Sequence, residues 1–137
     1  FFQTDRVRRA EAAVRAAQDI QAFTAELSGR EEVAALCQRV KLPGLGVAVG
    51  VNLATANCGL FGPNRNYTAF SSGMNQAARL QSLAGFRETL VMESVHEALT
   101  QSQEPFVRKL QFGPLTETPV KNVAQPLRHY RLEPLTP

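Results

Sequence analysis

Two polar side chains with the spacing of one helix face are the first candidates for chemistry. Asn75 and Arg79 are four residues apart, in a segment that follows two serines and carries apolar residues at helical intervals. Residues four apart in a helix lie on the same face, so an amide and a guanidinium would lie side by side near its N-terminus. The planar guanidinium can bind two phosphoryl oxygens, and a helix N-terminus favours an anion. The pair therefore predicts a site for a phosphate and its sugar.

Thr68 precedes this helix across a tight turn, in a short segment, residues 67–70, that is typical of a strand. Its hydroxyl can donate to or accept from the edge of a base. Each of these residues also has an ordinary interpretation. Asn75 and Arg79 taken alone are most simply a solvated helix face, and Thr68 is a common strand former.

The elements that must position these residues follow from hydrophobic periodicity. Apolar residues at steps of three and four predict a long helix over residues 5–27, and a capping box at residues 28–31 predicts a second helix to about residue 39. Ser71 or Ser72 is expected to cap the helix that carries Asn75. Further segments are a helix over residues 93–101 and strands over residues 45–53, 67–70, 88–92, 107–112, 118–123 and 127–132. Without regular alternation of strands and helices, this order predicts an α+β fold with helices on one side of a mainly antiparallel sheet.

Composition bounds the function classes. The 137 residues, 44% hydrophobic and 20% charged, are enough for one globular domain and exclude a disordered chain. The net charge of +3 comes from scattered basic residues, so we expect no nucleic-acid partner. No uncharged stretch reaches the ~18 apolar residues of a membrane span, so we expect no membrane contact. Cys37 and Cys58 match no metal or redox spacing, and no signal peptide is visible, which favours the cytoplasm.

Residues 67–80 resemble the signature of the class III nucleotidyl cyclases, the catalytic domain of adenylate and guanylate cyclases. That family's segment reads close to Tyr-Thr-Val-Ile-Gly-Asp-x-Val-Asn-x-Ala-Ala-Arg-Leu. The identical positions are Tyr67, Thr68, Asn75, Ala77, Ala78, Arg79 and Leu80. The resemblance extends over nearly all 137 residues, through residues 13–17, Gly46, Gly50, residues 59–62, residues 120–121 and residues 127–132.

The resemblance implies a ferredoxin-like nucleotidyl cyclase sandwich over residues 1–137, working as a head-to-tail homodimer. It implies that Asn75 orients the ribose, that Arg79 stabilises charge on the α-phosphate, and that Thr68 reads the purine, where threonine usually accompanies adenine. The expected reaction converts ATP to cyclic AMP and pyrophosphate with two Mg²⁺ ions. The metal-binding aspartates belong to the family's first strands, so we expect the Mg²⁺ ligands upstream of Phe1 and no turnover by these 137 residues alone.

Two alternatives stay open at this point. A cyclase-homology module without activity would dimerise or bind nucleotide to regulate an attached domain. An unrelated α+β binding domain would carry the motif by chance. Ser71 and Ser72 stand where the family has Gly-Asp, and this departure bears on activity.

Overall fold

The computed structural model describes residues 2–121 and 124–135, and for residues 2–4 and 67–70 it describes the backbone alone. Its elements, in chain order, are α1 (Phe2–Ser28), α2 (Glu31–Arg39), β1 (Val49–Val51), β2 (Asn57–Phe61), β3 (Asn66–Phe70), α3 (Ser72–Leu83), β4 (Thr89–Met92), α4 (Glu93–Leu99), α5 (Pro105–Arg108), β5 (Thr116–Thr118) and β6 (Leu127–Leu132). The mixture of helices and strands confirms the α+β class. No helix of the described residues is long and apolar enough to cross a membrane.

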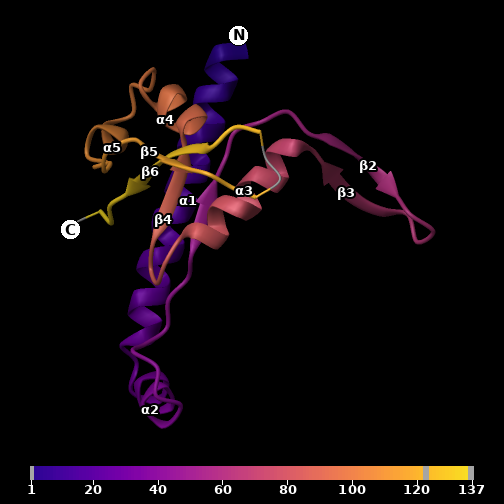
Figure 1. Ribbon diagram of the computed structural model, residues 1–137. Helices are drawn as coiled ribbons and strands as arrows, with labels where there is room; N and C mark the ends of the chain where they lie inside the picture. Colours follow the sequence, from indigo (N-terminus) through magenta and orange to yellow (C-terminus); the bar gives the residue numbers. More distant parts are fainter. Residues whose placement is uncertain (1, 122–123, 136–137) are drawn as a thin grey trace.

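The central sheet has four strands in the order β1-β4-β6-β5 (Figure 1). Strand β1 pairs parallel to β4, whereas β4 with β6 and β6 with β5 are antiparallel. The sheet is therefore mixed, with antiparallel pairing in the majority, as expected. In β4 all of Thr89, Leu90 and Val91 are buried, which is typical of a strand covered on both faces.

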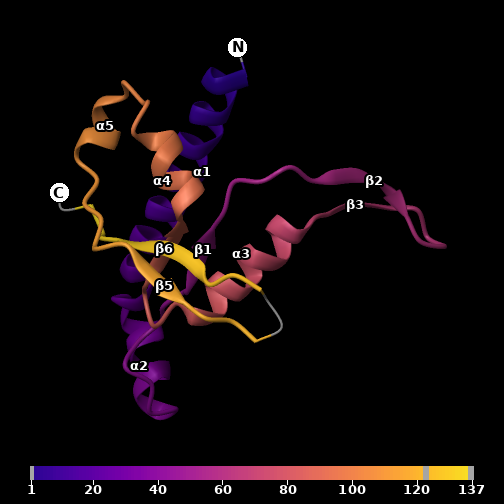
Figure 2. The same ribbon diagram turned by 45° about the horizontal axis from the view of Figure 1, so that its top comes forward.

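Helices cover both faces of this sheet (Figures 1 and 2). On one face α1 and α4 pack through Val14 and Val95 against Val91 of β4. On the other face Leu80 of α3 packs against Leu90 and Leu127. This arrangement differs from the expectation of helices on one side, because neighbouring residues of β4 point to opposite faces and both are apolar.

Three local expectations also differ from the structure. Only residues 49–51 of the expected strand 45–53 are in the sheet. Residues 105–108 form the short helix α5, with Pro105 in its first turn, where a strand over residues 107–112 was expected. The expected strand 118–123 lies instead at Thr116–Thr118, and residues 122–123 are outside the described part. Proline after Thr118 cannot donate to a ladder, which explains why the strand ends there.

Of the two helix caps that the sequence predicted, one is confirmed and the other is wrong. Ser71 caps α3, because its Oγ accepts a hydrogen bond from the Met74 N–H at 3.0 Å. The capping box expected before α2 is wrong, since Arg30 is at the cap position without a side-chain hydrogen bond. The Ser28 hydroxyl instead accepts from the Leu45 N–H at 2.9 Å, which ties the end of α1 to the chain that enters β1.

Strands β2 and β3 form a separate antiparallel hairpin that projects from the body of the molecule (Figure 2). Its turn includes two residues with positive φ, Gly62 at 81° and Arg65 at 49°. Because β3 leads directly into α3 through Ser71, the hairpin and the helix that carries Asn75 and Arg79 are continuous in the chain.

Candidate functional site

Helix α3 places Asn75 and Arg79 together on its outward side. The helix is regular from Ser72 to Leu83, so the two residues are one turn apart on one face, as the spacing predicted. Asn75 is exposed and Arg79 is partly exposed, whereas Gly73 and Leu80 are buried on the opposite side, against the sheet. Among the described residues, no hydrogen bond or ion pair engages either the amide or the guanidinium. Both groups are therefore available to a ligand.

Thr68 is brought close to this helix by the chain itself. Its backbone is in β3, opposite Gly59 of β2, three residues before the cap of α3. The side chain of Thr68 lies outside the described part, so its contact with a base remains a prediction.

The inward side of α3 rests on residues that the motif does not contain. The Asn52 Nδ2 donates to the Gly73 carbonyl oxygen at 2.9 Å and to Gln76 Oε1 at 3.4 Å. The Ser94 hydroxyl donates to Asn52 Oδ1 at 3.1 Å. One amide therefore joins the end of β1, the first turn of α3 and the start of α4. In the sequence Asn52 was visible only as a polar interruption of an apolar run.

A pocket of about 290 Å³ lies beside this amide. Asn52, Gln76, Ser94 and Arg128 are among the residues that line it. The guanidinium of Arg128 donates to Glu93 at 2.6 Å, and this hydrogen bond and the charge of Glu93 raise the pKa of Arg128. The pocket is on the inward side of α3, and Asn75 and Arg79 are not among its lining residues.

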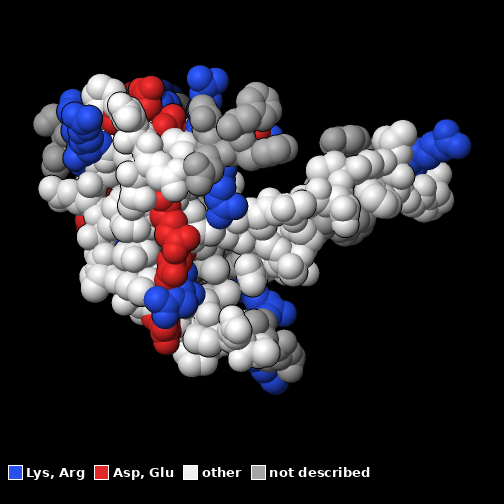
Figure 3. Space-filling view, turned by 90° about the horizontal axis from the view of Figure 1, so that it is seen from above, with Lys and Arg blue, Asp and Glu red and all other residues white. Residues whose placement is uncertain are grey.

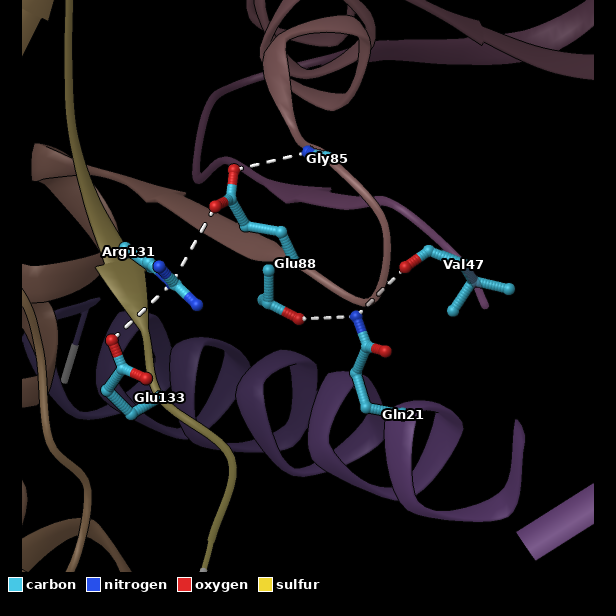
Figure 4. Close-up of polar contacts among 7 residues, drawn as sticks. Gln21, Val47, Gly85, Glu88, Arg131 and Glu133 are labelled. Atoms are coloured by element: carbon cyan, nitrogen blue, oxygen red, sulfur yellow. Dashed lines mark hydrogen bonds and ion pairs between the residues drawn. The ribbon is translucent and has the colours of Figure 1, made fainter. Parts of the chain in front are cut away.

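A second set of polar contacts lies at the other end of the sheet, where β1 and β4 begin (Figure 4). Glu88 accepts a hydrogen bond from the Gly85 N–H at 3.2 Å, just after α3, and is 3.6 Å from Arg131 Nε. The buried Gln21 of α1 donates to the Val47 carbonyl oxygen at 3.2 Å and to the Thr89 hydroxyl, at the start of β4, at 3.0 Å. Gln21 therefore ties the chain entering β1 and the start of β4 to α1, and Glu88 ties the end of α3 to β6.

The next question is whether metal-ligating side chains gather in the part of the chain that the structure describes. No group of three or more His, Cys, Asp or Glu side chains comes together among them. Mg²⁺ in nucleotide sites is bound chiefly by carboxylates and phosphates, and neither Asn75 nor Arg79 has a carboxylate. On the face that Figure 3 shows, acidic side chains form a short stripe over the body, and basic side chains are dispersed around it.

Comparisons with known proteins identify the fold. No protein-family model and no curated protein sequence matches the chain. Solved structures do match it. An adenylate/guanylate cyclase/hydrolase from Silicibacter pomeroyi is 24% identical, with a TM-score of 0.58 over 91% of this chain and 63% of that chain. The adenylyl cyclase CyaB from P. aeruginosa is 19% identical, with a TM-score of 0.64 over 90% and 60%. The guanylyl cyclase Cya2 is 16% identical, with a TM-score of 0.70 over 98% and 60%.

The chain has the nucleotidyl cyclase fold. The expected cyclase-type sandwich is thereby confirmed, and it is shared by structures named for either nucleotide. The chain spans about 60% of the length of these cyclase structures.

Proposed function

We propose that the chain forms the greater part of a class III nucleotidyl cyclase catalytic domain, which converts ATP to cyclic AMP and pyrophosphate. The observation that supports this most directly is the outward face of α3. In a cyclase fold, a capped helix presents an unpartnered amide and an unpartnered guanidinium one turn apart. Because the substrate ATP is an intracellular metabolite, the proposal places the domain in the cytoplasm.

In the proposed reaction the 3′-hydroxyl gives its proton to water, the ribose 3′-oxygen attacks the α-phosphorus, and the bond from the α-phosphorus to the pyrophosphate leaving group breaks. Asn75 holds the ribose by its amide, which both donates and accepts. The Arg79 fork contacts α-phosphoryl oxygens, where negative charge accumulates as the new bond forms. The hydroxyl of Thr68 contacts the adenine edge. Mg²⁺, when bound by carboxylates from elsewhere, would neutralise the triphosphate and favour deprotonation of the 3′-hydroxyl.

In this proposal the metal-binding part of the site lies outside the described residues. The α3 face is open to solvent, and no group of three or more His, Cys, Asp or Glu side chains comes together among the described residues. We therefore propose that the domain functions as a head-to-tail homodimer, in which α3 of one protomer completes a site with metal-binding carboxylates of its partner.

A regulatory cyclase-homology module is the second candidate. Ser71 and Ser72 favour it, because they replace the Gly-Asp of the family signature next to the proposed site. Such a module would bind nucleotide or dimerise without turnover.

Replacing Arg79 by alanine in the full-length protein tests the proposal. Loss of one electrostatic donor to the transition state lowers kcat by about 10²–10³-fold, with a much smaller change in KM. Arg79→Lys should restore little, because a point charge does not reproduce the fork. Arg108→Ala, at an exposed arginine at the end of α5, is the matched control and should leave kcat unchanged. The products cyclic AMP and cyclic GMP are measured separately.

Each alternative gives a distinct result. An unchanged kcat in Arg79→Ala removes this residue from the mechanism. Cyclic GMP as the main product contradicts the adenine assignment of Thr68 but keeps the cyclase reaction. Nucleotide binding without either cyclic product, in the full-length protein with Mg²⁺, favours the regulatory module.

A further inference from the structure

Three alternate residues, one in β1 and two just after it, face the inward side of helix α3. They are Gly50, which approaches the α3 backbone, Asn52, which donates to Gly73, and Ala54, which lies against Gly73. A Cβ added to Gly50 would be 2.6 Å from the Gln81 nitrogen and 2.8 Å from the Ala77 carbonyl oxygen. The backbone of α3 therefore lies directly on β1, without side chains between them.

Asn52 makes the specific contact in this row. Its Nδ2 donates to the Gly73 carbonyl oxygen and to Gln76, and its Oδ1 accepts from the Ser94 hydroxyl and from the Leu53 N–H at 2.9 Å. Both donor hydrogens and both acceptor positions of the amide are occupied. Because a fully bonded amide has one orientation, it fixes the first turn of α3 relative to β1 and α4.

Ala54 makes the next contact with α3, at Gly73. A Cβ added to Gly73 would lie 2.1 Å from the Ala54 Cβ, so the two chains approach as closely as a glycine allows. Gly73 is buried and is only two residues before Asn75. The carbonyl of Gly73 is thus held by Asn52, and its Cα packs against Ala54.

The orientation of α3 determines where the outward side chains lie. Helix Cα atoms are about 2.3 Å from the axis and an extended arginine reaches about 6–7 Å further, so the Arg79 guanidinium lies at a radius of about 9 Å. A rotation of about 10° around the axis moves it by about 1.5 Å. A displacement of about 1 Å can lower a rate by about 10²-fold. The inward contacts therefore control the outward face.

We propose that Asn52 is a positioning residue for the cyclase reaction: by bonding the first turn of α3 from the end of β1, it aims Asn75 and Arg79 at the nucleotide. This inference rests on the proposed function, since it assigns a role for α3 in that reaction. In this role Asn52 acts through its hydrogen bonds to α3 and not through contact with the substrate.

The test compares Asn52→Asp with Ser94→Ala in the full-length protein. Aspartate keeps the acceptor oxygens but cannot donate to Gly73, whereas Ser94→Ala removes one hydrogen bond to Asn52 and leaves its contacts with α3. We expect Asn52→Asp to lower kcat by about 10²-fold with KM within about threefold, and Ser94→Ala to change kcat by less than about threefold. A kcat of Asn52→Asp within threefold of wild type, or equal losses in the two variants, overturns the proposal.

A reciprocal swap keeps the test decisive if Asn52→Asp does not fold. Gly73→Ala forces α3 away from Ala54, so kcat should fall by about tenfold or more, and adding Ala54→Gly should restore most of it. A double variant as impaired as Gly73→Ala overturns the close-contact argument.

Hydrogen exchange separates this inference from the proposed function. Asn52→Asp should accelerate amide exchange in residues 74–77, and Ser94→Ala should not. Exchange that is unchanged in Asn52→Asp overturns the positioning role, whatever the activity. If Arg79→Ala retains full kcat while the exchange differs as expected, the proposed roles on α3 fail and the structural link stands.

Discussion

Replacing Gly50 by alanine tests how closely helix α3 must approach strand β1. The added Cβ would be 2.6 Å from the Gln81 nitrogen, whereas an ordinary van der Waals contact begins at 3.4 Å, a deficit of 0.8 Å. The opposing atoms belong to the backbone of α3, so no side chain can rotate away. The helix must shift by about that distance, or the strand must bend.

The expected effect has a stability part and a catalytic part. Overpacking of a well-packed contact costs about 1–3 kcal/mol, which lowers Tm by roughly 3–15 °C for a domain of this size. Arg79 lies between the two contacted residues in the chain, Ala77 and Gln81, so its guanidinium moves with the helix. A shift approaching 1 Å predicts a loss in kcat of about 10- to 100-fold with a small change in KM.

Thermal unfolding and cyclic AMP formation are measured together in the full-length protein. Gly85→Ala is the matched control, because a Cβ at that position would meet nothing within 4 Å. We expect Gly85→Ala to retain Tm and kcat. If Gly50→Ala behaves like this control, α3 does not depend on the close approach to β1, and the reasoning is refuted.

Two further predictions concern the core and pH. Leu80→Ala removes a fully buried side chain and should lower the free energy of unfolding by about 2–5 kcal/mol, whereas Leu83→Ala, at a residue 41% exposed, should cost less than about 1 kcal/mol in urea titrations. Burial lowers the pKa of His129, with a smaller opposing effect of Glu88. Protonation therefore favours the unfolded chain, so stability should fall as the pH drops below the ordinary value of about 6.5, and His129→Gln should reduce this fall between pH 7 and 5.

The elements that the sequence predicted well have strong local signals. The helix α1 follows from apolar residues at steps of three and four, and α3 from a serine cap with apolar residues behind it. Strand β6 matches the prediction over residues 127–132 because apolar and polar side chains alternate along most of it. Each signal is contained within one element, so the rest of the fold was not needed.

The elements that were missed depend on contacts between distant segments. Residues 45–48 are apolar and β-branched in part, yet only Val49–Val51 pair with β4, because the chain before them follows the end of α1 instead. Residues 105–108 are too few to show a helical period, so their pattern did not predict the short helix α5. The parallel pairing of β1 with β4 joins residues that are 40 apart in the chain, so no local sequence pattern predicts it.

The residues of the candidate site also fall into those that the sequence identified and those that it missed. The motif identified Asn75 and Arg79, which lie on the outward side of α3, because their types carry chemistry that can be read without a structure. Gly50, Asn52 and Gly73 are not residue types that indicate chemistry by themselves, and their roles depend on partners about twenty residues or more away in the chain. A glycine or an asparagine in an apolar run predicts only a bend or a turn until its neighbour is known.

The departure from the family signature has a physical explanation at the start of α3. Ser71 and Ser72 replace Gly-Asp, and the Ser71 hydroxyl supplies the helix cap to the Met74 N–H, so the helix still begins before Asn75. The following Gly73 lets the same turn pack against Ala54. The substituted residues therefore maintain a defined start for the helix, and the outward positions of Asn75 and Arg79 do not require the Gly-Asp pair. The replacement consequently argues less strongly against catalysis than the sequence alone indicated.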